Sequence, residues 1–193
     1  MKKILIYLLS IGIFGVASIA NSQTIRIGTE GAYPPWNNLN SAGELEGAEI
    51  DFGNEACERM GVTCEWVTQD WDGIIPALLQ GKYDIIIAGM SITEERKEKV
   101  NFTTGYMTDG ARFAVLKNSG LANLNIAGMA KVNLNNAGGK EQAAIGQLIA
   151  AMDGKTVCVQ SSTIHQNFLE KHMSGAVDVK LYQAVDLSLI HIS

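Results

Sequence analysis

The sequence is poor in charged residues and lacks a stripe of basic ones. Asp, Glu, Lys and Arg make up 18% of its 193 residues, and the formal net charge is −5. Because nucleic-acid-binding proteins carry clustered Lys and Arg, nucleic acid is not expected as a partner. Hydrophobic residues, at 47%, are sufficient for the core of one large or two small globular domains.

Long apolar runs are missing except at the N-terminus. There, two lysines precede an apolar stretch over residues 4–19, which ends in a small-x-small sequence at Ala20. This order is typical of a secretory signal peptide, so we expect residues 1–20 to be removed and the mature protein to be periplasmic. An uncleaved membrane anchor is the alternative, although a stretch this short barely spans a bilayer.

Cysteine is also scarce, with three in the chain. Cys57 and Cys64 lie at the predicted end of a helix and start of a strand, and an exported protein keeps disulfides, so we predict a bridge; two buried thiols are the alternative. Cys158 is left over in an apolar strand, where a small buried thiol is expected. A nucleophile–base pair with His165 is the other interpretation, although no third residue is in place to orient it.

Residues 85–96, IIIAGMSITEER, combine a buried strand, a loop of small residues and a helix start. Thr93 has the position of a helix N-cap, and Gly89 and Ser91 lie in the loop before it. Free N–H groups and the planar guanidinium of Arg96 are the donors that a carboxylate needs. The alternative is a surface turn in which Arg96 only pairs with a glutamate, which would have the same sequence pattern.

Three strands are predicted in the first part of the chain, at 24–29, 63–67 and 83–87, with helices at 50–60 and 73–80 between them. Strands joined in this way pair in parallel, and their carboxyl ends meet at one edge of the sheet. The residues expected to converge there are Glu30, Tyr33, Trp36, Trp71, Ser91 and Arg96. A core loop in which Tyr33 and Trp36 only pack remains open for either ring.

The rest of the chain repeats the strand, hydroxyl loop and helix arrangement. The predicted elements are a short strand at 100–102, extended chain at 106–116, a loop at 120–139, a helix at 141–152, a strand at 156–159, a cap at 161–163, a helix at 164–173 and a strand at 177–181. A second α/β lobe therefore begins here. Two strands and two helices do not close a sheet with two buried faces, so we expect this lobe to be incomplete and the C-terminus to be truncated.

Four stretches carry a resemblance to a known family: IRIGTEGAYPPW, DFGNEACERMGVTCEWV, QDWDGIIPALLQGKYDIIIAGMSITEERKEKVNFT and GKTVCVQSSTIHQNFLEKH. They resemble the extracytoplasmic solute-binding proteins of ABC importers for polar amino acids, solute-binding protein family 3, of the lysine/arginine/ornithine/histidine type. The resemblance implies an α/β, two-lobed type II periplasmic binding protein fold, with lobe 1 at 24–112, a partial lobe 2 at 113–187 and an uncertain tail at 188–193. It also implies a monomer without cofactor, metal or catalytic residues, which delivers a free amino acid to permease subunits in the inner membrane.

The same resemblance implies a role for each site residue. Arg96 is expected to hold the ligand α-carboxylate, with help from Ser91 and from main-chain N–H groups at Gly89 and Thr163. Tyr33 and Trp71 are expected to stack on the aliphatic stem, with Trp36 nearby. Glu30 is expected to meet a cationic end, and because burying such an end without a counter-charge is costly, a basic ligand is predicted: arginine, lysine or ornithine.

Departures from the family pattern keep other interpretations open. Ala88 and Gly89 stand where close relatives have serines, the aspartate that pairs the ligand α-ammonium has no equivalent, and His165 is expected to cap a helix rather than contact ligand. An exported cyclohexadienyl-dehydratase-like enzyme is one alternative, for which Glu30 and His165 would be the acid–base candidates. A ligand-sensing domain of a membrane receptor is the other.

Overall fold

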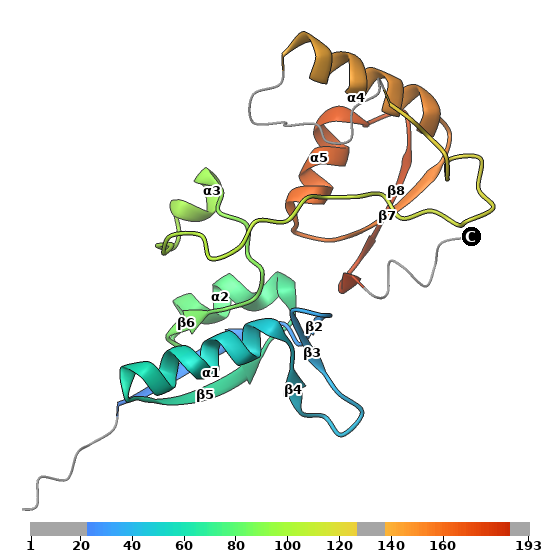
Figure 1. Ribbon diagram of the computed structural model, residues 1–193. Coiled ribbons are helices and arrows are strands. Elements are labelled where there is room, and N and C mark those ends of the chain that lie inside the picture. The colour runs from blue at the N-terminus through green and yellow to red at the C-terminus, as the bar shows by residue number, and fades with distance from the viewer. Residues whose placement is uncertain (1–22, 127–137, 186–193) are drawn as a thin grey trace, which may run out of the picture.

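The computed structural model describes residues 23–126 and 138–185, in which two groups of elements are joined by a long segment without regular structure (Figure 1). The predicted signal peptide, the predicted tail and most of the predicted loop at 120–139 lie outside the described residues. We call the group from β1 to α3 the first lobe and the group from α4 to β8 the second. The predicted boundary at residue 112 stays a prediction.

The first lobe is built on a parallel sheet with the strand order β5-β1-β6. β1 spans Thr24–Thr29, β5 spans Thr63–Thr68 and β6 spans Ile85–Ile86. The predicted parallel pairing is confirmed: β1 pairs with β5 residue by residue and with β6 over two residues. β6 is shorter than the predicted strand at 83–87, yet the Ile87 N–H still donates to the Gly28 carbonyl of β1, 3.0 Å away.

Helices connect these strands. α1 spans Ala48–Met60, and Gly61 follows it in the left-handed conformation, at a φ of 68°, as predicted. After β5, a 3-10 turn η1 at Trp71–Gly73 leads into α2 at Ile74–Leu79. Two buried clusters hold the helices on the sheet: one contains Trp71, Ile74, Ala77, Tyr83 and Ala88, and the other contains Ile27, Cys57 and Ile87.

The chain after β1 forms a small antiparallel sheet that was predicted as a loop followed by a turn. β2 at Ala32–Tyr33, β3 at Asn37–Leu39 and β4 at Leu45–Glu46 pair in sequence order. The Pro34–Pro35 peptide is cis, and the Trp36 N–H donates to the Tyr33 carbonyl at 2.9 Å, which closes the β2–β3 turn. The prolines therefore exclude helix, as expected, but they do not prevent strands on either side.

The strand predicted at 100–102 is wrong. No regular element occurs between α3 at Glu94–Lys97 and residue 126 in the described chain. The same holds for the extended chain predicted at 106–116. Its apolar residues Phe113, Val115 and Leu116 are exposed, and no strand in the described residues pairs with them. Apolar β-formers alone do not make a strand, because the backbone also needs a partner for its N–H and C=O groups.

The second lobe contains a two-stranded parallel sheet with two helices. α4 spans Gly139–Met152, β7 Thr156–Gln160, α5 Ile164–His172 and β8 Asp178–Tyr182. β7 and β8 pair directly, and α5 and α4 pack on them (Figure 1). The buried residues of this core are Met152, Val157, Val159, Leu169 and Met173. Each element agrees with its predicted range to within two residues.

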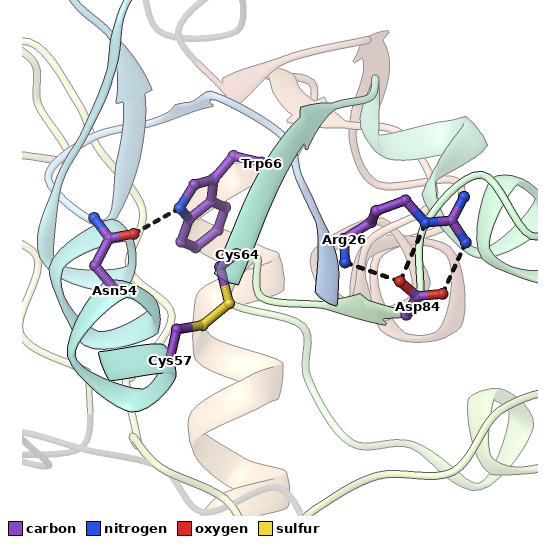
Figure 2. The surroundings of a disulfide bond; sticks show 6 residues. All are labelled: Arg26, Asn54, Cys57, Cys64, Trp66 and Asp84. Atoms are coloured by element: carbon purple, nitrogen blue, oxygen red, sulfur yellow. Dashed lines mark hydrogen bonds and ion pairs between the residues drawn. A yellow bond between two sulfur atoms is a disulfide. The ribbon is translucent and has the colours of Figure 1, made fainter. Parts of the chain in front are cut away.

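A disulfide ties α1 to β5. Cys57, in the last turn of α1, is bonded to Cys64 near the start of β5, as Figure 2 shows, and their Cα atoms are 6.1 Å apart. The predicted bridge is therefore confirmed. Beside it, the Trp66 indole N–H donates to Asn54 Oδ1 at 2.9 Å, a second link between the same helix and strand.

A bidentate ion pair joins β1 to the start of β6 (Figure 2). Arg26 Nη2 donates to Asp84 Oδ1 at 2.8 Å, and both the Arg26 side-chain Nε and its main-chain N–H donate to Asp84 Oδ2. These hydrogen bonds lower the pKa of Asp84 to about 2. A lowered carboxyl pKa stabilises the folded state above the ordinary value of 3.8, and this contribution is lost as the pH falls toward 2.

We therefore expect Asp84→Asn to lower the midpoint of thermal unfolding at pH 7. The difference from wild type should shrink as the pH falls from 4 to 2, a window set by the two pKa values of Asp84. Calorimetry at a series of pH values measures this. Glu55→Gln, which removes an exposed helical pair with Arg59, is the control, and its midpoint should stay near wild type. A constant Asp84→Asn difference at every pH would contradict the assignment.

Candidate functional site

A cavity of about 220 Å³ lies between the two lobes, and residues of both lobes line it. Its lining includes all but one of the predicted site residues: Glu30, Tyr33, Trp71, Gly89, Ser91, Arg96 and Thr163. A second cavity of about 240 Å³ shares Tyr33, Gly89, Ser91 and His165 with the first. The exception is Trp36, which lines neither cavity; its carbonyl accepts the Glu49 N–H at the start of α1, 2.9 Å away.

Arg96 is held at this cavity by its own short helix. The Thr93 hydroxyl caps α3 by accepting the Arg96 N–H at 3.2 Å, as predicted for this position. The guanidinium donates to the Ser91 carbonyl at 2.8 Å and lies over the Trp71 ring, 5.3 Å from its centroid. Burial lowers the pKa of Arg96, which nevertheless remains a cation at neutral pH.

The Ser162 carbonyl of the second lobe accepts two hydrogen bonds from the first. Arg96 Nη2 and Trp71 Nε1 both donate to it, each at 3.1 Å. Ser162 has a φ of 56°, a left-handed conformation that costs a non-glycine residue roughly 1 kcal/mol. Two of the five guanidinium N–H groups are thus paired, and the other three have no hydrogen-bond partner among the described residues.

Glu30 is held by a contact from the second lobe. Gln160, at the end of β7, donates from Nε2 to Glu30 Oε1 at 2.5 Å and to the Gln183 carbonyl at 3.0 Å. In the next residue, the Ser161 hydroxyl donates to the Asp72 carboxylate, with distances of 2.9 and 3.0 Å to its two oxygens. Glu30, which follows β1, and Asp72, which follows β5, thus both make polar contacts with the second lobe.

Gly89 lines the cavity, but its N–H is already paired. It donates to Glu49 Oε1 at 2.6 Å, so the prediction that this N–H serves an anion in the cavity has no support in the geometry. Gly89 has a φ of 57°, and a Cβ built on it would be 3.0 Å from Cε1 of Tyr33. The absence of a side chain therefore lets the Tyr33 ring lie against the loop that follows β6.

Thr163 caps α5, because its hydroxyl accepts the Gln166 N–H at 3.3 Å. This makes the predicted capping role of His165 wrong. His165 lies in the first turn of α5 and lines both cavities, where desolvation lowers its pKa.

Cys158 is a free thiol as expected, but it is half-buried rather than buried, and it lines the cavity between the lobes. Among the described residues, no hydrogen bond joins Cys158 to His165.

Sequence reasoning missed Glu49 and Gln160. Glu49 is 2% exposed and holds the Gly89 N–H, although an acid in the first turn of a helix is ordinarily a solvated residue that favours the helix dipole. Gln160 ends a strand and has no pattern that marks it. A second guanidinium, that of Arg112, also lines the cavity, and its Nη1 lies 3.7 Å from Asp109 Oδ1.

Two kinds of feature are not found in the described residues. No group of three or more His, Cys, Asp or Glu side chains within 23–126 and 138–185 could hold a metal ion. Over the same residues, none of the helices has the length and apolar character needed to cross a membrane.

Comparison with known protein families and curated proteins identifies binding proteins in both cases. Residues 25–186 match the family described as bacterial extracellular solute-binding proteins, family 3. The octopine-binding periplasmic protein of Rhizobium meliloti is 44% identical, over 86% of this chain and 56% of its own length. The L-arginine-binding protein of Pseudomonas aeruginosa is 42% identical, over 63% of this chain and 47% of its own length. The chain thus spans about half the length of these curated relatives, which are named as binding proteins rather than enzymes.

The structural comparison confirms the predicted fold class. The crystal structure of a periplasmic His/Glu/Gln/Arg/opine family-binding protein from Silicibacter pomeroyi, in complex with lysine, matches with a TM-score of 0.64 and 36% sequence identity. The match covers 87% of this chain and 62% of that one. The fold is therefore the α/β type II periplasmic binding protein fold.

We expect Gly89→Ala to lower the free energy of unfolding by about 1–2 kcal/mol, because alanine is strained at this φ and its Cβ meets the Tyr33 ring. Urea denaturation measures the loss. Gly110→Ala is the matched control: Gly110 lies in a loop at the neighbouring cavity, its φ is not in the left-handed region, and a Cβ there meets nothing within 4 Å. Equal stability of the two variants would show that Gly89 is not constrained as described.

Proposed function

Because the chain belongs to the bacterial extracellular solute-binding proteins, family 3, we propose that it binds a free basic amino acid in the cavity between its lobes. Arginine, lysine and ornithine are the candidates. The observation that carries the proposal is that a guanidinium, a carboxylate and two aromatic rings line one cavity, contributed by Arg96, Glu30, Tyr33 and Trp71.

Each group suits one part of such a ligand. The three remaining N–H groups of Arg96 match the planar α-carboxylate, and the Trp71 ring beneath the guanidinium keeps it in place. The faces of Tyr33 and Trp71 offer apolar surface to the aliphatic stem. Glu30 supplies the negative charge that a buried ammonium or guanidinium end requires.

Lobe closure follows from the contacts between the lobes. Trp71 and Arg96 of the first lobe meet the Ser162 carbonyl of the second, and Glu30 meets Gln160. The cavity is also lined by Gln160 and Thr163 of the second lobe, so a ligand in it contacts both lobes only when they are closed. Such a ligand therefore favours the closed arrangement over an open one. The closed complex, in the periplasm, would then deliver the amino acid to an ABC permease as a monomer.

A second ligand class has support from Arg112. This guanidinium lines the same cavity as Arg96, so the cavity offers two cations to anionic groups. An arginine derivative with a second carboxylate would use both, and octopine, which the relative from Rhizobium meliloti binds according to its name, is a compound of that kind. Titration with octopine beside arginine distinguishes the two ligand classes.

We expect Glu30→Gln to weaken arginine binding roughly tenfold or more, because it removes a charge-assisted hydrogen bond from the cationic end of the ligand. The affinity for glutamine, a neutral amino acid of similar shape, should change less, so discrimination falls. Isothermal titration calorimetry gives both constants. Glu46→Gln, an exposed acid in β4, is the control and should bind as wild type does. Unchanged arginine affinity in Glu30→Gln would count against a basic ligand held by Glu30.

A further inference from the structure

Glu49 is a buried carboxylate that touches neither cavity. It lies in the first turn of α1, with 2% of its surface exposed. Three donors surround it: Asn37 Nδ2 at 2.6 Å, the Gly89 N–H at 2.6 Å and the Tyr106 hydroxyl. No Lys or Arg side chain of the described residues forms an ion pair with it. The three donors therefore compensate the cost of burying this acid.

Each donor comes from a different segment, and two of the donor residues, Gly89 and Tyr106, line a cavity. Asn37, in β3, also accepts the Gly31 N–H with its Oδ1 at 2.8 Å, next to Glu30. Gly89 lies in the loop between β6 and Arg96. Tyr106 belongs to the segment after α3 that forms a wall of the larger cavity. The Glu49 carboxylate thus joins the segment that carries Glu30 to the segment that carries Arg96.

The helix dipole does not explain this arrangement. Asp51, in the same turn of α1, is exposed and gives the helix the same favourable negative charge without burial. Burying Glu49 adds nothing to that effect, and the desolvation of the carboxylate opposes folding. What burial provides is a fixed point between a strand and two loops, because each donor must keep its distance and direction to the same two oxygens.

We propose that Glu49 is a positioning residue of the binding cavity. Through Asn37 and Gly31 it sets the placement of Glu30, and through Gly89, against which the Tyr33 ring lies, it sets the placement of the loop that leads to Arg96. It thereby fixes the spacing between the groups for the two charged ends of a ligand. The inference rests on the proposed function, since it concerns the affinity for a basic amino acid.

The test compares Glu49→Gln with Asp51→Asn, a matched acid-to-amide change in the same helical turn. Calorimetric titration of both variants and wild type with arginine and with lysine gives the affinities. Glu49→Gln should weaken binding roughly tenfold, the effect of losing a hydrogen bond to a buried charge, and should change the arginine-to-lysine affinity ratio because these ligands differ in length. Asp51→Asn should leave both unchanged. A purely structural role would lower the melting temperature without changing that ratio.

A second variant and a second measurement guard against poor folding of Glu49→Gln. Tyr106→Phe removes one donor and keeps the ring that stacks on Phe52, with centroids 5.4 Å apart; binding should weaken several-fold. In wild type without ligand, NMR should show slow hydrogen exchange at the Gly89 amide, and Tyr106→Phe should speed it. Wild-type affinities in Glu49→Gln and Tyr106→Phe would overturn this inference alone, whereas a wild-type chain that binds no basic amino acid would overturn the proposed function and this inference with it.

Discussion

The parallel pairing of β1 with both β5 and β6 is the constraint on which the site depends. Because the three strands run in one direction, the segments that follow them leave the sheet at the same edge. Glu30 follows β1 directly, Trp71 comes shortly after β5 and Arg96 follows the loop after β6. Residues that are far apart in the sequence therefore meet at one cavity.

Hydrogen bonds around this edge form two layers. Beneath the cavity, Glu49 gathers donors from three segments; at the cavity, the Ser162 carbonyl and the Gln160 amide of the second lobe take up the donors and acceptors of Trp71, Arg96 and Glu30. A buried polar group without a partner would be costly, so each layer restrains the segments that its hydrogen bonds join. Under the proposed function, these layers place the residues of both lobes that a ligand in the cavity would contact.

Local patterns predicted the parallel strands and the longer helices but missed the β2-β3-β4 sheet. Strand alternation, glycine after a helix and threonine caps depend on nearby residues; both Thr93 and Thr163 cap as expected. Local patterns gave wrong predictions where burial or strand formation depends on residues far away in the sequence. In α1 the apolar Phe52 is 49% exposed, whereas the acid Glu49 is buried. Three donors from outside the helix make the burial of Glu49 favourable. The strand expected at 100–102 is missing for the converse reason, since no partner strand in the described chain receives it. Of the predicted site, Trp36 lies away from the cavities and the Gly89 N–H is paired.

The central claim is that Arg96, Glu30 and two aromatic rings surround one ligand. The most direct measurement is isotope-filtered NMR of the chain saturated with arginine, which records nuclear Overhauser contacts between ligand methylene protons and protein rings. The account predicts contacts to both Tyr33 and Trp71 and none to Trp36. Bound arginine with contacts to neither Tyr33 nor Trp71 would contradict it.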